Sequence, residues 1–335
     1  MSSATAPRRE ELRRLASETA MAVRVATGRL DLPPPTPADG PDPYGNPDPE
    51  WLRVDWREHL RQIDVVGARV NYVEMGEGPP LLFVHGLGGC WQNWLENVPH
   101  FARSHRVVAL DLPGFGSSPT PPWQISISAY GRFLRDFCER LAIDRCSLVG
   151  NSMGGFIASE VAITEPERVD DLTLVSAAGI SWARARREPA EMAARIGRAA
   201  APLILRFELS AIRRPKIRDR AFRGVFHDPS HLRRELLWEN VVPAFESPGF
   251  VDSMRTLVGY DIRDRLEEIE VPTLIVWGRN DHVVPVPAAF SYKKRIGENA
   301  ELVIFDECGH VPMMERPVRF NRTVERFLAR EGVLT

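Results

Sequence analysis

The spacing of hydrophobic positions changes along this chain, and each change predicts a different element. From residue 8 to residue 28, apolar side chains recur at helical intervals, which predicts an amphipathic helix that Gly28 can end. Prolines then crowd residues 32–49, so regular structure is excluded there and an extended linker is expected. We expect the helix to pack on its own domain, with a partner chain or a lipid surface as the alternatives.

From residue 60 onward, short apolar runs alternate with helical patterns. Residues 60–66 and 69–75 flank Gly67-Ala68 and predict a β-hairpin. Six later runs, rich in Val, Ile and Leu, are short enough for buried strands. These runs are residues 81–84, 107–110, 147–149, 172–175, 273–277 and 302–305, and the helical stretches are 128–141, 153–165, 288–296 and 318–330. The alternation predicts an α/β fold whose mostly parallel sheet is covered by helices on both faces.

One interval, between Val175 and Thr273, contains no strand pattern and reads as several helices broken at Pro202, Pro215, Pro229, Pro243 and Pro248. We interpret residues 181–245 as an inserted helical cap. This stretch holds 14 Lys or Arg against 7 Asp or Glu, so it is basic within a chain whose formal net charge is -2. The predicted organisation is therefore an N-terminal helix and linker (1–50), a first core segment (51–180), the cap (181–245) and a second core segment (246–335).

Composition excludes several classes of protein. The small net charge gives no field that would attract nucleic acid. Four cysteines lack C-x-x-C spacing, which argues against a zinc site and against a disulfide framework. The N-terminus lacks a secretory signal, and no apolar stretch reaches the roughly 18–20 residues that span a bilayer. We expect a cytoplasmic protein with reduced thiols, soluble or at most in peripheral contact with a membrane.

The strongest local motif is G-x-S-x-G, formed by Gly150, Ser152 and Gly154. It directly follows an apolar strand pattern and opens a helix, which is the context that a nucleophile elbow requires. Glycines let such a sharp turn form, and the helix N-terminus places its free N–H groups beside the serine. The pattern predicts that Ser152 is a nucleophile.

A serine hydroxyl needs a base, and the base needs a carboxylate to orient it. We select His310, after the last strand, as the base and Asp281, after the strand before it, as the carboxylate. His85 is the rival base, interpreted as a histidine that stabilises its loop by hydrogen bonds. Asp306 is interpreted as a structural loop carboxylate, and His282 as a packing or solvated residue. Surface or core positions are expected for His59, His100, His105, His227 and His231.

The glycine-rich run His85-Gly-Leu-Gly-Gly89 follows the strand at 81–84 and predicts one half of an oxyanion hole. We expect the backbone N–H groups of Leu87 and Met153 to face the acyl carbonyl oxygen. A phosphate loop is excluded, because no Gly-Lys-Ser/Thr follows. Cys90 and Cys308 are interpreted as packing residues.

Together the motifs HGLGG, DLPGFGSS, GNSMGG and GRNDHVVP…CGHVPMMERP resemble the α/β-hydrolase family over about residues 55–335. The resemblance implies an eight-stranded sheet, a lid over the site and no cofactor. It also implies that Asp111 and the loop at 114–118 support the fold. Dehalogenases and epoxide hydrolases carry aspartate where this chain has Ser152, which argues against those branches.

GNSMGG also resembles hydrolases that cleave carbon–carbon bonds in ring-fission products. Their oxyanion loop usually reads HGGGPGA and tryptophan follows their histidine, whereas this chain has Leu87 to Cys90 and Val311. These differences favour a carboxylesterase or lipase-like enzyme that acts on a small-molecule ester with an apolar acyl group. A carbon–carbon hydrolase and a ligand receptor on the same scaffold remain the alternatives. Apolar cap residues are candidates for an acyl pocket, although we expect more than half of them to pack the cap on the body: Met192, Leu203, Ile204, Leu205, Phe207, Phe226, Leu236, Leu237 and Trp238.

Overall fold

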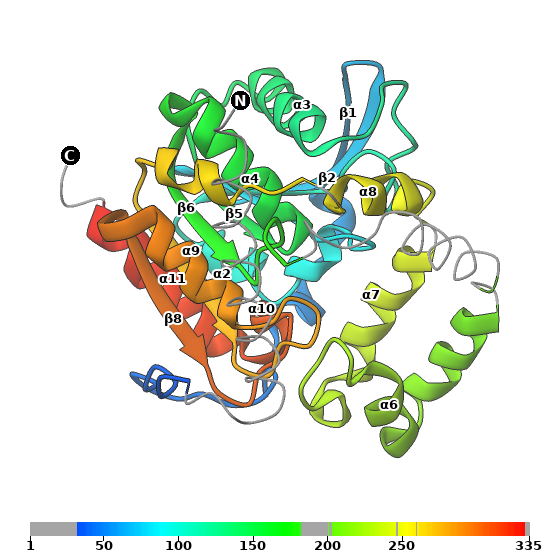
Figure 1. Cartoon of the computed structure of the whole chain (residues 1–335). Helices are drawn as coiled ribbons and strands as arrows, with labels where there is room; N and C mark the ends of the chain where they lie inside the picture. Colours follow the sequence, from blue (N-terminus) through cyan, green and yellow to red (C-terminus); the bar gives the residue numbers. More distant parts are fainter. Residues whose placement is uncertain (1–31, 182–199, 201–202, 246, 259, 332–335) are drawn as a thin grey trace, which may run out of the picture.

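The computed structural model describes residues 32–181, 200, 203–245, 247–258 and 260–331, so the helix expected at residues 8–28 lies outside the described residues. Its centre is an eight-stranded sheet in the order β1-β2-β4-β3-β5-β6-β7-β8 (Figure 1). The first three pair as antiparallel neighbours, and every later pair is parallel. The expected hairpin and the mostly parallel sheet are therefore confirmed. The strands are β1 (Leu60–Val65), β2 (Ala68–Met75), β3 (Pro80–Val84), β4 (Arg106–Leu110), β5 (Cys146–Asn151), β6 (Val169–Val175), β7 (Thr273–Gly278) and β8 (Ala300–Phe305).

Helices cover both faces of the sheet because strand side chains alternate in direction. In β3, Leu82 and Val84 join a core cluster built with α3, α4 and α9. Leu81 and Phe83 point into the opposite cluster, which α2 and α11 complete. The α-helices of the core are α2 (Val98–Phe101), α3 (Ile127–Arg140), α4 (Met153–Thr164), α9 (Pro287–Ile296), α10 (Pro312–Glu315) and α11 (Pro317–Glu331). Short 3-10 helices join them: η1 (Glu50–Arg53), η2 (Trp56–Glu58), η3 (Trp91–Trp94), η4 (Pro166–Arg168), η5 (Pro229–His231), η6 (Arg263–Glu268) and η7 (Gly297–Asn299).

The helix starts follow from local chemistry. Ser126 precedes α3, and its hydroxyl accepts a hydrogen bond from the Ala129 N–H at 3.1 Å, which caps the helix. Proline opens α9 and α11, where its missing N–H would have had no helical partner. The four helices expected from periodicity therefore form within one or two residues of their expected bounds.

Between β6 and β7 the described residues form helices and no strand. Residues 203–212 are helical, and α6 (Pro215–Phe222), α7 (Arg234–Phe245) and α8 (Phe250–Leu257) follow. Phe226, Leu236 and Leu237 are buried and belong to the core cluster that contains Phe83. This part of the cap is thus packed on the body as expected, whereas Met192 lies outside the described residues.

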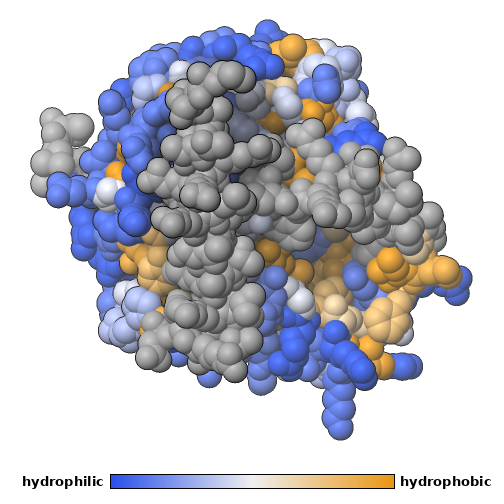
Figure 2. Space-filling view, in the orientation of Figure 1, coloured by the Kyte–Doolittle hydropathy of each residue, from blue (hydrophilic) through white to orange (hydrophobic). Residues whose placement is uncertain are grey.

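Other apolar cap side chains face outward. Leu203, Phe207 and Trp238 are exposed, while Ile204 and Leu205 are half-buried. In Figure 2, hydrophobic surface lies over the cap, next to hydrophilic surface. The outer face of the cap is therefore apolar in places and hydrophilic in others.

The proline-rich residues 32–49, here called the strap, form no helix or strand, yet they are bound to the core (Figure 1). The Thr36 N–H donates to the Ile304 carbonyl, and the Ile304 N–H donates to the Thr36 hydroxyl, both at 3.0 Å. The Arg319 guanidinium donates to Asp42 at 3.0 Å. Proline thus removes regular structure here without detaching the segment from β8 and α11.

Close backbone approach at Gly154 supports a first prediction. A Cβ atom at this position would lie 2.2 Å from the Val84 carbonyl oxygen and 2.6 Å from that of His85. We expect Gly154→Ala to lower the free energy of unfolding by about 1–3 kcal/mol, because α4 must move away from β3. Urea unfolding followed by circular dichroism measures the change.

Gly224→Ala is the matched control, since a Cβ there would meet no atom within 4 Å. Its free energy of unfolding should stay within about 0.5 kcal/mol of the wild type. Equal losses in the two variants would contradict the close-approach argument.

Candidate active site

Three predicted residues follow the carboxyl ends of three parallel strands of the sheet. Ser152 follows β5, Asp281 follows β7 and His310 follows β8. Because β5 to β8 are parallel and adjacent, their carboxyl ends lie on one edge of the sheet, where loops form binding sites in α/β folds. The topology accordingly brings the three loops to the same edge.

Ser152 has the strained backbone of a nucleophile elbow. Its φ is 54° and its ψ is -115°, a conformation that costs a non-glycine residue about 1–3 kcal/mol. Three backbone hydrogen bonds hold it there. The Ser152 N–H donates to Val175 O at 2.9 Å, and its carbonyl accepts from Ala178 N at 2.9 Å and Phe156 N at 3.1 Å. Neighbouring β6 and the first turn of α4 therefore fix the direction of the serine.

His310 and Asp281 form a buried hydrogen-bonded pair. The His310 Nδ1 atom lies 2.8 Å from Asp281 Oδ2, and the aspartate side chain is completely buried. The other carboxylate oxygen accepts N–H groups from Val283 and Val284, each at 2.8 Å. We assign the proton to Nδ1, because the carboxylate accepts it, and this leaves Nε2 as the basic nitrogen. Asp306 and His282 are both exposed, as expected for residues outside the pair.

Asn151 ties the serine turn to the histidine loop, a contact that sequence reasoning missed. Its Nδ2 donates to the Val175 carbonyl at 3.1 Å and to the His310 carbonyl at 3.3 Å. The signal was available in the motif itself, because an amide side chain directly before the nucleophile can bridge two loops. Through Asn151 the carboxyl end of β5 is joined to the loop that carries His310.

The glycine-rich loop after β3 passes directly over Ser152. A Cβ atom on Gly86 would lie 3.0 Å from the Ser152 Cβ, so a side chain at this position would crowd the serine. Leu87 is the next residue of the loop, and Met153 is the first residue of α4, whose N–H has no acceptor within the helix. The two segments expected to supply N–H groups thus meet beside the serine.

These loops and strands are shared with a known family. A model of the alpha/beta hydrolase family matches residues 81–323. The chain belongs to the α/β-hydrolase family. The cap, the serine turn and the histidine loop all fall within the matched residues.

The relatives of this α/β hydrolase differ in the bonds that they cleave. The chain is 31% identical over 280 residues to a 2-hydroxy-6-oxo-6-phenylhexa-2,4-dienoate hydrolase of Comamonas testosteroni. The match covers 80% of this chain and 94% of the relative. Among solved structures, a membrane phospholipase A described as a bacterial virulence factor is 30% identical, with a TM-score of 0.64 over 81% of this chain and 86% of that one. A meta-cleavage product hydrolase of Pseudomonas fluorescens IP01 is 25% identical, with a TM-score of 0.64 over 82% and 99% of the two chains.

In this hydrolase His85 has no free ring nitrogen. Its Nε2 accepts the Leu112 N–H at 2.9 Å and its Nδ1 donates to the Gly86 carbonyl at 2.7 Å. Complete burial lowers the pKa of His85 to about 4. The ring therefore stays neutral at pH 7 and stabilises the glycine-rich loop, the structural role expected for it.

Asp111 and the two cysteines near the site, Cys90 and Cys308, also have structural roles. Asp111 accepts N–H groups from Trp91 at 2.8 Å and Ser117 at 2.9 Å, and burial raises its pKa to about 6. Burial raises the pKa of the Cys90 and Cys308 thiols well above the ordinary value, so neither is a thiolate at neutral pH.

None of the helices in the described part of the chain is both long enough and apolar enough to cross a membrane.

Burial of His85 supports a prediction about pH. The folded-state pKa of about 4 lies below the ordinary histidine pKa of 6.5, so between these values the unfolded chain binds a proton that the folded protein does not. The contribution of neutral His85 to the free energy of unfolding is fully present above pH 6.5. It is lost as the pH falls toward 4, and the loss is about 3 kcal/mol at most. Urea unfolding at pH 7, 6, 5 and 4.5 measures the loss.

His85→Gln separates this histidine from other titrating groups. Glutamine Oε1 can still accept the Leu112 N–H, but the side chain takes up no proton. We expect the variant to be less stable at pH 7 and to lose less stability on acidification than the wild type. Parallel pH curves for the two proteins would show that His85 does not carry the effect.

Proposed function

We propose that this α/β hydrolase is a serine hydrolase that cleaves carboxylic esters through an acyl-enzyme intermediate. The observation that carries the proposal is the buried His310–Asp281 pair, joined through Asn151 to a strained Ser152 turn. A strained serine, an oriented histidine and a buried carboxylate form the arrangement that activates a hydroxyl for acyl transfer.

The cycle follows from these positions. Ser152 Oγ attacks the ester carbonyl carbon while His310 Nε2 takes the hydroxyl proton. The carbonyl oxygen becomes negative and accepts the N–H groups of Leu87 and Met153, the proposed oxyanion donors. The carbon–oxygen bond to the alcohol then breaks, and the alcohol leaves with the proton from His310. Water repeats the sequence, gives its proton to His310, and releases the acid and Ser152.

Charge supports an ester over a ring-fission dienoate as substrate. A dienoate carries a carboxylate that needs a cation when it is buried. The described chain buries four arginines, and each already has an oxygen partner within the protein. Arg218 bonds to Ser230 O, Arg263 to Asp261, Arg316 to Asp42 O and Arg319 to the Asp42 carboxylate. A neutral ester makes no such demand on the site.

The position of the cap supports an apolar acyl group. Phe250 lies against the oxyanion loop, where a Cβ on Gly88 would be 3.3 Å from its ring. On the other side, the Val225 carbonyl accepts the His310 N–H at 2.8 Å. Phe250 of α8 thus brings an apolar ring to the glycine-rich loop, and the backbone of Val225 borders the histidine loop. Contact of the exposed cap face with a membrane surface stays a prediction from the sequence.

Carbon–carbon bond hydrolysis is the second candidate function. It is favoured by the 31% identity with the dienoate hydrolase of Comamonas testosteroni over most of both chains. The two candidates share the nucleophile and base but differ in the leaving group, which is an alkoxide oxygen in one and a carbon in the other. Substrate tests therefore separate them.

A ladder of p-nitrophenyl esters from acetate to palmitate tests the proposal. We expect serine-dependent turnover with an optimum at one acyl length. Ser152→Ala should lower kcat/KM by roughly four orders of magnitude or more, because the nucleophile is lost. Release of p-nitrophenolate gives the rates.

Ser159→Ala is the matched control, because Ser159 also lies on α4 and its hydroxyl donates within the helix to Gly155 O. It should keep its activity within about threefold of the wild type, as expected for a change of roughly 0.5 kcal/mol. Turnover of a ring-fission dienoate without turnover of any ester would replace the ester proposal with the carbon–carbon candidate. Unchanged ester rates in Ser152→Ala would remove the nucleophile assignment.

A further inference from the structure

A second buried carboxylate, Glu315, holds the loop that carries His310. Glu315 ends α10 and its side chain has no solvent exposure. Its Oε1 accepts the N–H groups of Gly309 at 2.9 Å and Val311 at 3.3 Å, the two residues that flank His310. Burial raises the pKa of Glu315, while these donors act in the opposite direction. The carboxylate therefore fixes the backbone on both sides of the histidine.

The other oxygen of Glu315 joins two further parts of the molecule. Oε2 accepts the Tyr44 hydroxyl of the strap and the His227 N–H of the cap, each at 2.7 Å. The Tyr44 hydroxyl oxygen in turn accepts the Asp228 N–H at 2.7 Å. One carboxylate and one hydroxyl thus connect the strap, the cap and the histidine loop in a continuous chain of hydrogen bonds.

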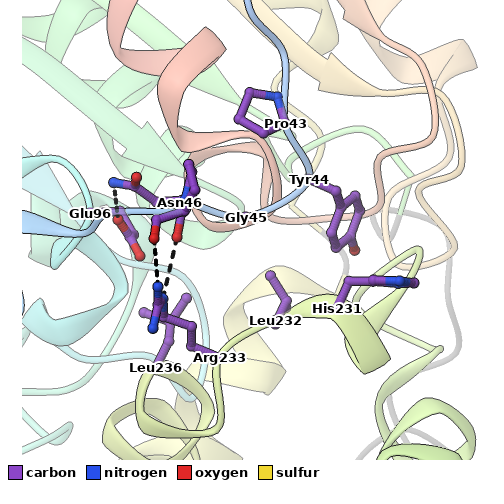
Figure 3. Close-up of a pocket in the computed structure, with 10 residues that line it drawn as sticks. Pro43, Tyr44, Gly45, Asn46, Glu96, His231, Leu232, Arg233 and Leu236 are labelled. Atoms are coloured by element: carbon purple, nitrogen blue, oxygen red, sulfur yellow. Dashed lines mark hydrogen bonds between the residues drawn. The ribbon is translucent and has the colours of Figure 1, made fainter.

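The strap and the cap meet through hydrogen bonds and through an edge contact between the Tyr44 and His231 rings. A cavity of about 260 Å³ lies between them, lined by strap residues on one side and by Leu232 and Leu236 on the other (Figure 3). Across this gap, Arg233 of the cap donates to the carbonyls of Asn46 at 3.3 Å and Pro47 at 2.6 Å. These hydrogen bonds, together with the contact between the Tyr44 and His231 rings, help to set how the cap is seated beside the strap.

The strap itself is held firmly on the core. The Gly45 N–H donates to the Glu315 carbonyl at 2.7 Å, and Asn46 Nδ2 donates to the buried Glu96 at 2.9 Å. The Arg316 guanidinium lies 5.1 Å from the centre of the Tyr44 ring. Tyr44 is therefore presented to Glu315 from an anchored backbone and can act as a fixed point.

We propose that Tyr44 is a positioning residue for His310, acting through Glu315 and the cap residues His227 and Asp228. The proposal rests on the function proposed above for His310. Tyr44 lies outside residues 81–323, the part of the chain that the family model matches. The strap thus adds to the hydrolase core a support for its general base.

Tyr44 can position the histidine loop because its hydroxyl both donates to Glu315 and accepts from Asp228. Without it, Asp228 N–H loses its acceptor and Glu315 Oε2 loses one of two donors, so the carboxylate can rotate. Rotation would release Gly309 and Val311 and shift the imidazole that they flank. Proton transfer tolerates little displacement, and a misplacement of about 1 Å can slow a reaction about 100-fold.

The test measures how fast a small fluorophosphonate labels Ser152 in the full chain. This rate depends on activation of the serine by His310 and hardly on the ester substrate. We expect Tyr44→Phe to slow labelling by about tenfold or more, within the range that misplaced groups produce. Labelling is followed by intact-protein mass spectrometry below the melting temperature of every variant.

Tyr260→Phe is the matched control, because the Tyr260 hydroxyl also donates to a buried carboxylate, Glu160, at 2.7 Å. Both variants lose a tyrosine–carboxylate bond, so similar falls in Tm are expected, but Tyr260→Phe should label within about twofold of wild type. Labelling of Tyr44→Phe at the wild-type rate, or equally slow labelling in both variants, would overturn the proposal.

Two further measurements keep the result clear. Glu315→Gln should also slow labelling, and adding Tyr44→Phe to it should slow labelling little more, since both act through one contact. The low-field proton resonance of His310 Nδ1–H should shift in Tyr44→Phe and stay in place in Tyr260→Phe. Additive effects of the two substitutions, or an unmoved resonance, would count against the relay.

Failure of the ester proposal and failure of the Tyr44 proposal give different experimental results. Wild-type protein that labels at Ser152 but hydrolyses no ester would remove the ester assignment and leave the comparison of tyrosine variants valid. Wild-type protein that does not label would overturn both the role of His310 and the role of Tyr44.

Discussion

The strained turn at Ser152 is the constraint on which the rest of the structure depends. A serine at φ 54° is stable only where surrounding bonds outweigh a cost of about 1–3 kcal/mol. Those bonds come from Val175 and Ala178 at the end of β6 and from Phe156 in α4. They require β6 to lie beside β5 and α4 to start at once, close against the carbonyls of β3. The order of the strands, the position of α4 and the glycine at 154 are consequently all needed to keep the Ser152 turn in its strained conformation.

The same edge of the sheet solves an electrostatic problem. A fully buried Asp281 carboxylate would be costly to desolvate if it stood alone. It is paired instead with His310 and with two backbone N–H groups of its own loop. Because three of its bonds come from fixed positions, the carboxylate holds the imidazole in one tautomer and one orientation. Burial, which opposes an isolated charge, here keeps water from competing with the pair.

Much of this arrangement could be predicted from the sequence, because strand and helix patterns are local. Parallel strands bring their carboxyl ends together, so the loops of Ser152, Asp281 and His310 had to meet once the strands were identified. The bonds of Tyr44 were not predictable in this way, since it meets Glu315 across 271 residues. Proline content shows that the strap lacks regular structure, but it does not say which surface binds it. That depends on Arg316, Arg319 and Glu315, whose partners no local pattern encodes.

The core and the cap differ in the same way, because local strand patterns set the core and long-range contacts seat the cap. The core supplies groups whose positions are set by a sheet, whereas the cap is seated by buried apolar side chains such as Leu236 and Leu237 and by hydrogen bonds around a cavity. Val225, His227 and Asp228 make their bonds to the histidine loop and the strap through backbone atoms alone. The side chains at these three positions can thus vary while the backbone contacts beside His310 are kept. The buried arginines of the described chain each donate to a protein oxygen, and so help to hold the cap, the strap and the segment before β7 in place.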